Sequence, residues 1–84
     1  MKKLLTDNSL FGQNLKKIRT DCKMTQEQVV TKLQLMGSPI SRSTYSLIEM
    51  GRGNIFISDL IGLQQIFKVD FKEFFKDIPV QRDN

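Results

Sequence analysis

The segment from residue 41 to residue 50 contains residue types that can recognise a nucleic acid. If it is a helix, its advance of about 100° per residue places small hydroxyls and a leucine opposite an inward-facing Tyr45, with an arginine at the edge of that face. These residues are Arg42, Ser43, Ser46 and Leu47. Arginine and hydroxyl groups can hydrogen-bond base edges, and the major groove of B-DNA admits one α-helix. The alternative is a solvent-exposed polar face with one apolar residue, which requires no ligand.

Glu49 stands in the last turn of this predicted helix, where the helix macrodipole disfavours a negative charge. A nearby cation would offset that effect, and Arg19 is the candidate. Arg19 follows Leu15 by four residues, so it lies at the border of the apolar stripe of an earlier helix. We therefore expect a partly buried ion pair that joins the two helices and fixes their geometry more than it adds stability.

The elements that must position these residues read as helices throughout, because no strand-like alternation lasts long enough to matter. Apolar residues at helical spacing predict a first helix from about Ser9 to Cys22. They are Phe11, Leu15, Ile18 and Cys22. We expect Cys22 to be a buried, inert thiol. A fourth helix should begin near Ser58, with an apolar face formed by Leu60, Leu63, Ile66 and Phe67.

Capping signals mark the ends of the other helices. Polar residues that can cap an N-terminus begin the second, third and fifth helices: Thr25, Ser41 and Asp70. Gln28 and Glu73 stand three residues after the first and last of these, which is the spacing of a capping box. Gly37 can supply the left-handed conformation that ends the second helix. The sequence therefore predicts an all-α fold of five short helices.

Composition argues against several classes of function. The chain has 84 residues, one cysteine and no histidine, so neither an internal disulfide nor a plausible zinc site is expected. It has no phosphate-binding glycine loop and no carboxylate pair with an evident pocket. We therefore expect no enzyme activity, no metal, no cofactor and no small-molecule substrate. The lack of a signal-peptide core and of a membrane-length apolar segment predicts a cytoplasmic protein with no membrane partner.

The charge is distributed unevenly along the chain. Residues 1–57 contain nine Lys/Arg and four Asp/Glu, a net +5, whereas residues 58–84 contain four and five, a net −1. The basic part includes the predicted helix at residues 41–50, which favours a polyanionic partner. A solvated basic surface is the alternative.

From Phe11 to about Phe75 the chain resembles the helix-turn-helix family of lambdoid phage repressors and Cro proteins, the XRE-like family. The matching residues are Arg19, Thr25-Gln26-Glu27, Ile40-Ser41 and Ser46-x-Ile48-Glu49-x-Gly51. The resemblance implies a compact five-helix lambda-repressor-like DNA-binding domain at residues 9–77, between an N-terminal arm (1–8) and a C-terminal tail (78–84). It also implies a bacterial or phage transcriptional regulator, nucleoid-associated and a repressor, that binds double-stranded DNA sequence-specifically.

The resemblance also assigns roles to individual residues. A recognition helix at residues 41–50 would contact bases through Arg42, Ser43, Ser46 and Leu47. Phosphate contacts would come from Gln26, Arg52 and Asn54, and Gln26 would also help to orient the recognition helix. A homodimer is expected because two copies can read half-sites about one helical turn apart. The cluster of Phe71, Phe74, Phe75 and Ile78 is then either core or partly a dimer contact.

Two features depart from the usual pattern of this family. The stretch QLMGSP separates Leu33 from Ile40 where the family has a single glycine, which makes an extended turn between the second and third helices. Val30 and Tyr45 are bulkier than the usual residues at their positions. We expect the third helix to enter the groove at an altered angle. A protein-interaction module on the same fold, such as an antitoxin-like or antirepressor-like partner, is the alternative function, and the basic first part of the chain favours DNA.

Overall fold

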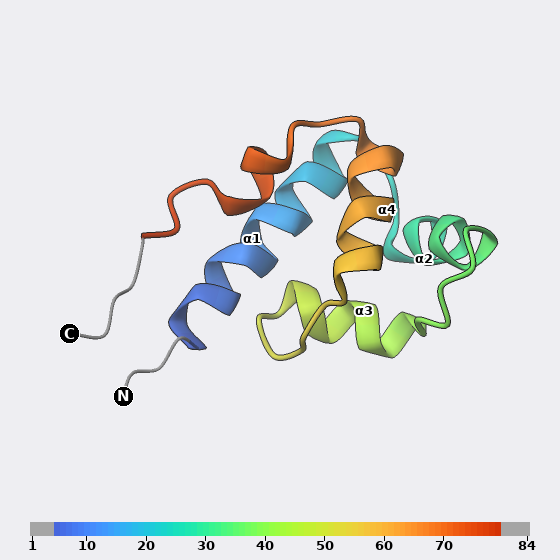
Figure 1. The fold of residues 1–84 in the computed structure, drawn as a ribbon, viewed down its shortest axis with the longest axis horizontal. Coiled ribbons are helices and arrows are strands. Elements are labelled where there is room, and N and C mark those ends of the chain that lie inside the picture. The colour runs from blue at the N-terminus through green and yellow to red at the C-terminus, as the bar shows by residue number, and fades with distance from the viewer. Residues whose placement is uncertain (1–4, 80–84) are drawn as a thin grey trace.

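A computed structural model describes residues 5–79, which form four α-helices and one short 3₁₀-helix (Figure 1). The elements are α1 (Leu5–Asp21), α2 (Gln26–Leu35), α3 (Arg42–Glu49), α4 (Ile57–Phe67) and η1 (Phe71–Phe75). The all-α prediction is confirmed for this range, but the count of five helices is not, because four of the elements are α-helices and the last is a 3₁₀-helix. The Asp70 side chain accepts a hydrogen bond from the N–H of Lys72, whereas the predicted capping box requires a bond from the N–H of Glu73. Residues 71–75 form the tighter 3₁₀-helix.

The helices enclose one apolar core. α1 packs against η1 and α3, and α2 packs against α3 and α4. In Figure 1, α3 lies along one edge of the molecule, α4 stands above it in this view, and η1 lies beside α1. Every element supplies at least one fully buried side chain to this core, the largest being Tyr45, Phe74, Leu15, Leu33, Leu63 and Val29. Because α3 uses only one of its faces for this packing, its other face remains open to solvent.

The first helix differs from its prediction at both ends. It begins at Leu5, four residues earlier than expected, so only residues 1–4 of the predicted arm lie outside the described residues. It ends at Asp21, and Lys23 takes a left-handed conformation with φ 58°. Cys22 is therefore the capping residue at the edge of the core, and it is exposed rather than buried. The prediction of a buried thiol is wrong.

The second helix begins and ends as its sequence predicts. The Thr25 hydroxyl accepts from the N–H of Gln28, and the Gln28 side chain accepts from the N–H of Thr25, which completes the capping box. At the other end, Gly37 has φ 101° and the N–H of Ser38 bonds to the carbonyl of Leu33. These are the features of a Schellman motif. A connection of residues 36–41 then leads to α3; its effect on docking to DNA stays a prediction.

The N-cap of α3 offers a first test of the local structure. The Ser41 hydroxyl accepts from the N–H of Thr44 at 3.1 Å. Ser41→Ala should lower the free energy of unfolding by about 1 kcal/mol, because it leaves that N–H without its partner. Ser58→Ala, in the first turn of α4 and exposed, is the control and should change it by less than about 0.5 kcal/mol. Urea unfolding measures both, and equal values would show that the cap contributes nothing.

Candidate nucleic-acid interface

The two faces of α3 have opposite character. Tyr45 and Ile48 point into the core and are buried. Arg42 and Ser43 are exposed, Ser46 is half-buried, and Leu47 is 41 % exposed. All four residues predicted as base contacts therefore have some solvent-accessible surface on a regular helix. The free flank that the sequence predicted for residues 41–50 is present.

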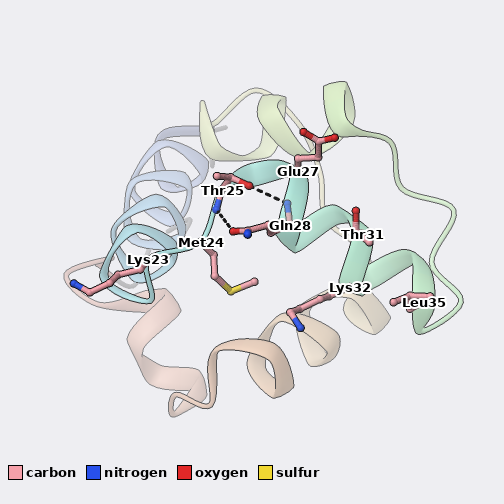
Figure 2. Close-up of a pocket in the computed structure, with 8 residues that line it drawn as sticks. All are labelled: Lys23, Met24, Thr25, Glu27, Gln28, Thr31, Lys32 and Leu35. Carbon is pink, nitrogen blue, oxygen red and sulfur yellow. Dashed lines mark hydrogen bonds between the residues drawn. The ribbon is translucent and has the colours of Figure 1, made fainter.

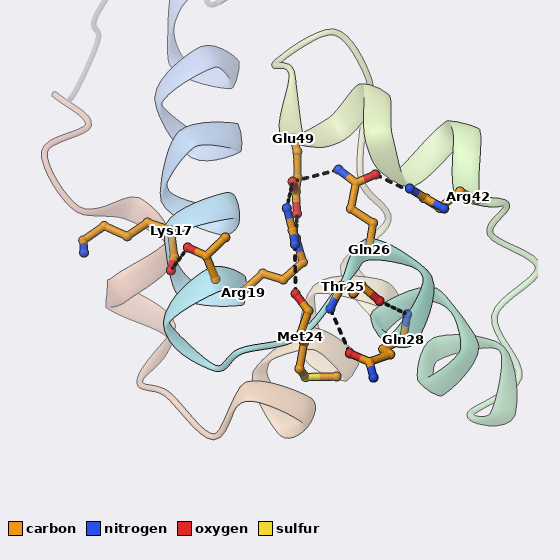
Figure 3. Close-up of polar contacts among 9 residues, drawn as sticks. Lys17, Arg19, Met24, Thr25, Gln26, Gln28, Arg42 and Glu49 are labelled. Carbon is orange, nitrogen blue, oxygen red and sulfur yellow. Dashed lines mark hydrogen bonds and ion pairs between the residues drawn. The ribbon is translucent and has the colours of Figure 1, made fainter.

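The expected pair between Arg19 and Glu49 joins α1 to α3 (Figure 3). Arg19 donates from Nε to Glu49 Oε2 at 2.7 Å and from Nη2 to Oε1 at 3.0 Å, a bidentate arrangement. Its Nη1 donates to the carbonyl of Met24 at 2.9 Å. The two side chains are only 11 % and 2 % exposed. The pair thus attaches the C-terminal end of α3 to both α1 and the turn that leads into α2.

The environment of this pair keeps Glu49 ionised. Burial by itself raises the pKa of the Glu49 carboxyl, but hydrogen bonds from Arg19 and Gln26 and the nearby Tyr45 hydroxyl outweigh it. The pKa of Glu49 therefore lies below the ordinary value of glutamate. The hydrogen bond to Glu49 raises the pKa of Arg19. Both charges persist at neutral pH, so the charge that the macrodipole of α3 disfavours has a permanent partner.

Gln26 extends this network to the other end of α3. Its Nε2 donates to Glu49 Oε1 at 2.9 Å, and its Oε1 accepts from Arg42 Nε at 3.2 Å (Figure 3). Four predicted site residues therefore meet in one hydrogen-bonded chain: Arg19, Glu49, Gln26 and Arg42. The sequence suggested the first two as a pair, but the bridge formed by Gln26 depends on the packing of α2 on α3 and has no signal in residue spacing.

Tyr45 contributes a polar group that the sequence analysis did not anticipate. Its side chain is fully buried, and its hydroxyl lies near the Arg19–Glu49 pair without a hydrogen bond of acceptable geometry within the described residues. Burial raises the pKa of this hydroxyl above its ordinary value. The sequence assigned Tyr45 only to the core, and its position in α3 one turn before Glu49 was the available signal.

Arg52 and Asn54, the other predicted phosphate contacts, follow the C-terminal end of α3. Gly51, with φ 76°, ends the helix, and the N–H of Arg52 bonds to the carbonyl of Leu47 at 2.9 Å. Both side chains are exposed. They lie at the opposite end of α3 from Arg42, so the structure brings Gln26 and Arg42 together but leaves Arg52 and Asn54 separate from them.

A close contact between backbones sets the position of α3 against α1. A Cβ atom built on Gly12 would lie 2.4 Å from the carbonyl oxygen of Glu49 and 2.6 Å from that of Ile48. Because residue 12 has no side chain, α1 and α3 can approach closely enough for Arg19 and Glu49 to form their ion pair. The sequence analysis did not single out this glycine.

Other parts of the surface are less suited to hold a ligand. Figure 2 shows an open depression along α2, where the capping-box side chains of Thr25 and Gln28 each accept a hydrogen bond from the backbone N–H of the other residue. Its charged lining residues have both signs: Lys23, Glu27 and Lys32. Among residues 5–79, no group of three or more His, Cys, Asp or Glu side chains could hold a metal ion. No helix of the described range is both long enough and apolar enough to cross a membrane.

A helix, a turn and a second helix with a free polar face form the arrangement of a helix-turn-helix DNA-binding domain. The family model described as Helix-turn-helix matches residues 15–74, most of the chain. The chain belongs to the Cro/C1-type (XRE) helix-turn-helix family, whose members are DNA-binding regulators and generally not enzymes. It is a DNA-binding regulator of this type. Comparisons with curated proteins and with solved structures gave no match.

Proposed function

We propose that this protein is a sequence-specific transcriptional repressor that inserts α3 into the major groove of DNA. The base contacts are Arg42, Ser43, Ser46 and Leu47, and the phosphate contacts are Gln26, Arg52 and Asn54. One observation carries the proposal. Arg42 is an exposed cation in the first turn of α3, where the macrodipole is positive, and that turn contains no acidic residue. The positive charge of Arg42 is unfavourable at this positive end of the helix, and the phosphates of a bound polyanion would compensate both charges.

We also propose that the protein binds DNA as a homodimer through η1. Phe71 and Phe75 are 40 % and 47 % exposed, whereas Phe74 between them in the chain is fully buried. Two exposed aromatic side chains on so short an element are a favourable contact for a second copy. To read successive major-groove half-sites, such a two-fold dimer has to place its two α3 helices about 34 Å apart.

The α2–α3 connection supports an altered docking angle. Six residues, from Met36 to Ser41, separate the two helices. Val30 and Tyr45 are both buried in the core to which α2 and α3 contribute. Larger side chains between packed helices increase their separation. The third helix is therefore proposed to enter the groove at an angle different from that in relatives with a short turn.

DNA binding should depend steeply on salt and on Arg42. Binding to random duplex DNA should weaken by a factor of ten or more between about 50 and 200 mM salt, because bound phosphates release counterions. On a selected binding site, Arg42→Ala should cost about 1–3 kcal/mol and relax the preference at one base pair. Fluorescence anisotropy measures both effects. Lys32→Ala, on exposed α2 surface away from α3, is the control. An equal loss on all sequences would instead make Arg42 a phosphate contact.

A protein-interaction module is the second candidate, because α3 also has exposed apolar side chains. Leu47 on α3 and Met50 at its C-cap are both accessible, and Phe56 and Ile57 are exposed at the start of α4. Such residues could contact another protein instead of thymine methyl groups. If the protein does not bind duplex DNA even at low salt, this second function replaces the first.

A further inference from the structure

Gln26 lies between a fixed anion and an exposed cation. Its amide nitrogen donates to Glu49 Oε1 at 2.9 Å, and its amide oxygen accepts from Arg42 Nε at 3.2 Å. A carboxylate can only accept hydrogen bonds and a guanidinium can only donate them, so the two neighbours determine which way the amide points. Glu49 is itself held by two bonds from Arg19. The buried Arg19–Glu49 pair thus fixes the orientation of the Gln26 side chain.

The contact with Gln26 leaves a particular edge of Arg42 free. A guanidinium has five N–H groups, and the one on Nε is directed at Gln26. The two terminal nitrogens remain, and they present parallel donors at the end of the side chain. Two donors side by side fit two acceptors side by side.

Only one base offers that pattern in the major groove. Guanine presents N7 and O6, both acceptors, whereas adenine presents an acceptor and a donor. Thymine presents one acceptor beside a methyl group, and cytosine presents a donor. The charge of Arg42 also remains available, because the neutral amide of Gln26 orients it without neutralising it. The first turn of α3 has no acidic residue to do so.

We infer that Arg42 reads a guanine end-on through Nη1 and Nη2, in the orientation that its bond to Gln26 gives it. This inference rests on the proposed function, since it names the base that one residue of the same interface recognises. Gln26 acts here through Arg42, in addition to any phosphate contact of its own.

The test uses a site selected by the full-length protein from random duplex DNA. Each guanine of the site is replaced in turn by 7-deazaguanine, which lacks the N7 acceptor. For the unmodified protein we expect one replacement to raise the Kd about fivefold or more, the low end of the discrimination of a bidentate pair. For Arg42→Ala the same replacement should have no effect, because alanine has no side-chain donor for guanine N7 or O6.

Gln26→Leu separates positioning from general binding. It removes the bridge but leaves both bonds between Arg19 and Glu49, so the domain should fold, which circular dichroism and urea unfolding can check. Its ratio of Kd values for 7-deazaguanine and guanine should fall towards that of Arg42→Ala. Loss of a phosphate contact would weaken both sites equally and leave the ratio unchanged. Gln65→Leu, an exposed glutamine of α4, is the matched control and should keep the ratio of the unmodified protein.

The outcomes distinguish the inference from the function on which it rests. Salt-dependent, sequence-selective binding with no guanine that responds to 7-deazaguanine would overturn the inference and leave the DNA-binding function intact. Full discrimination in Gln26→Leu would overturn the positioning role of Gln26. No binding to duplex DNA at low salt would overturn both.

Discussion

Arg19→Met should lower the free energy of unfolding by about 3–5 kcal/mol, because it leaves the carboxylate of Glu49 buried without its cationic partner. The Glu49 side chain is only 2 % exposed, so water cannot replace the two hydrogen bonds that Arg19 provides. The free energy of unfolding of a natural domain is about 5–15 kcal/mol, so the variant should lose a large fraction of its stability. Urea denaturation followed by circular dichroism measures the change.

The chain contains its own control for this prediction. Lys17 and Asp21 form an ion pair on the surface of the same helix at 3.3 Å, with side chains 74 % and 67 % exposed. Lys17→Met should change the stability by less than about 1 kcal/mol, because water solvates both charges. The double variant Arg19→Met/Glu49→Leu should recover most of the loss, since it removes the unpaired charge as well. If Arg19→Met is as mild as Lys17→Met, the pair is not a structural element.

The same pair predicts a dependence on pH. The pKa of Glu49 is lower in the folded protein than its ordinary value. A carboxyl group of this kind stabilises the fold above its ordinary pKa of about 4.3, and that stabilisation is lost as the pH falls through this value towards the folded pKa. The unmodified protein should therefore lose more stability between pH 6 and pH 3 than the double variant does. Parallel curves would show that Glu49 is not the responsible group.

Gly12→Ala should lower the free energy of unfolding by about 1–3 kcal/mol, although it adds only one methyl group. Its new Cβ would meet the carbonyl oxygens of Glu49 and Ile48 at 2.4 and 2.6 Å, and these backbone atoms can move only if α3 moves. The change should also separate Arg19 from Glu49. It should therefore weaken specific DNA binding even where the protein remains folded, which anisotropy on a selected site would detect.

Gly62→Ala is the matched control, because it also replaces a glycine inside a helix. Both changes gain about 1 kcal/mol of helix propensity. At residue 62, however, the new Cβ meets the side-chain ends of Leu33 and Met36, at 2.9 and 3.4 Å, which can rotate away. Gly62→Ala should be neutral or slightly stabilising in urea unfolding. Equal stability of the two variants would mean that the backbones of α1 and α3 are not in close contact at residue 12.

Local features of the structure could be predicted from the sequence because their causes lie within a few residues. The capping box of Thr25 and Gln28, the cap of Ser41 and the left-handed Gly37 all depend on hydrogen bonds or backbone angles within one turn. The fifth helix was the local exception. Asp70 does cap it, at the N–H of Lys72, but the element is a 3₁₀-helix and not an α-helix.

Cys22 shows that hydrophobic periodicity alone does not predict burial at the end of a helix. Its spacing continues the apolar stripe of α1, but the helix ends at Asp21 and the core does not extend beneath the next residue. Hydrophobic periodicity indicates the direction in which a side chain points, and only the packing of other elements decides whether anything covers it.

By itself, the sequence determined the all-α class, the helix that presents Arg42 and the opposite charges that join Arg19 to Glu49. The tertiary structure alone decided how close α1 comes to α3 at Gly12, and that the amide of Gln26 lies between Glu49 and Arg42. The physical reason is one of range. Helix formation and capping act between neighbours in the chain. The contacts that orient α3 and Arg42 join residues 16 to 37 positions apart, which only folding brings together.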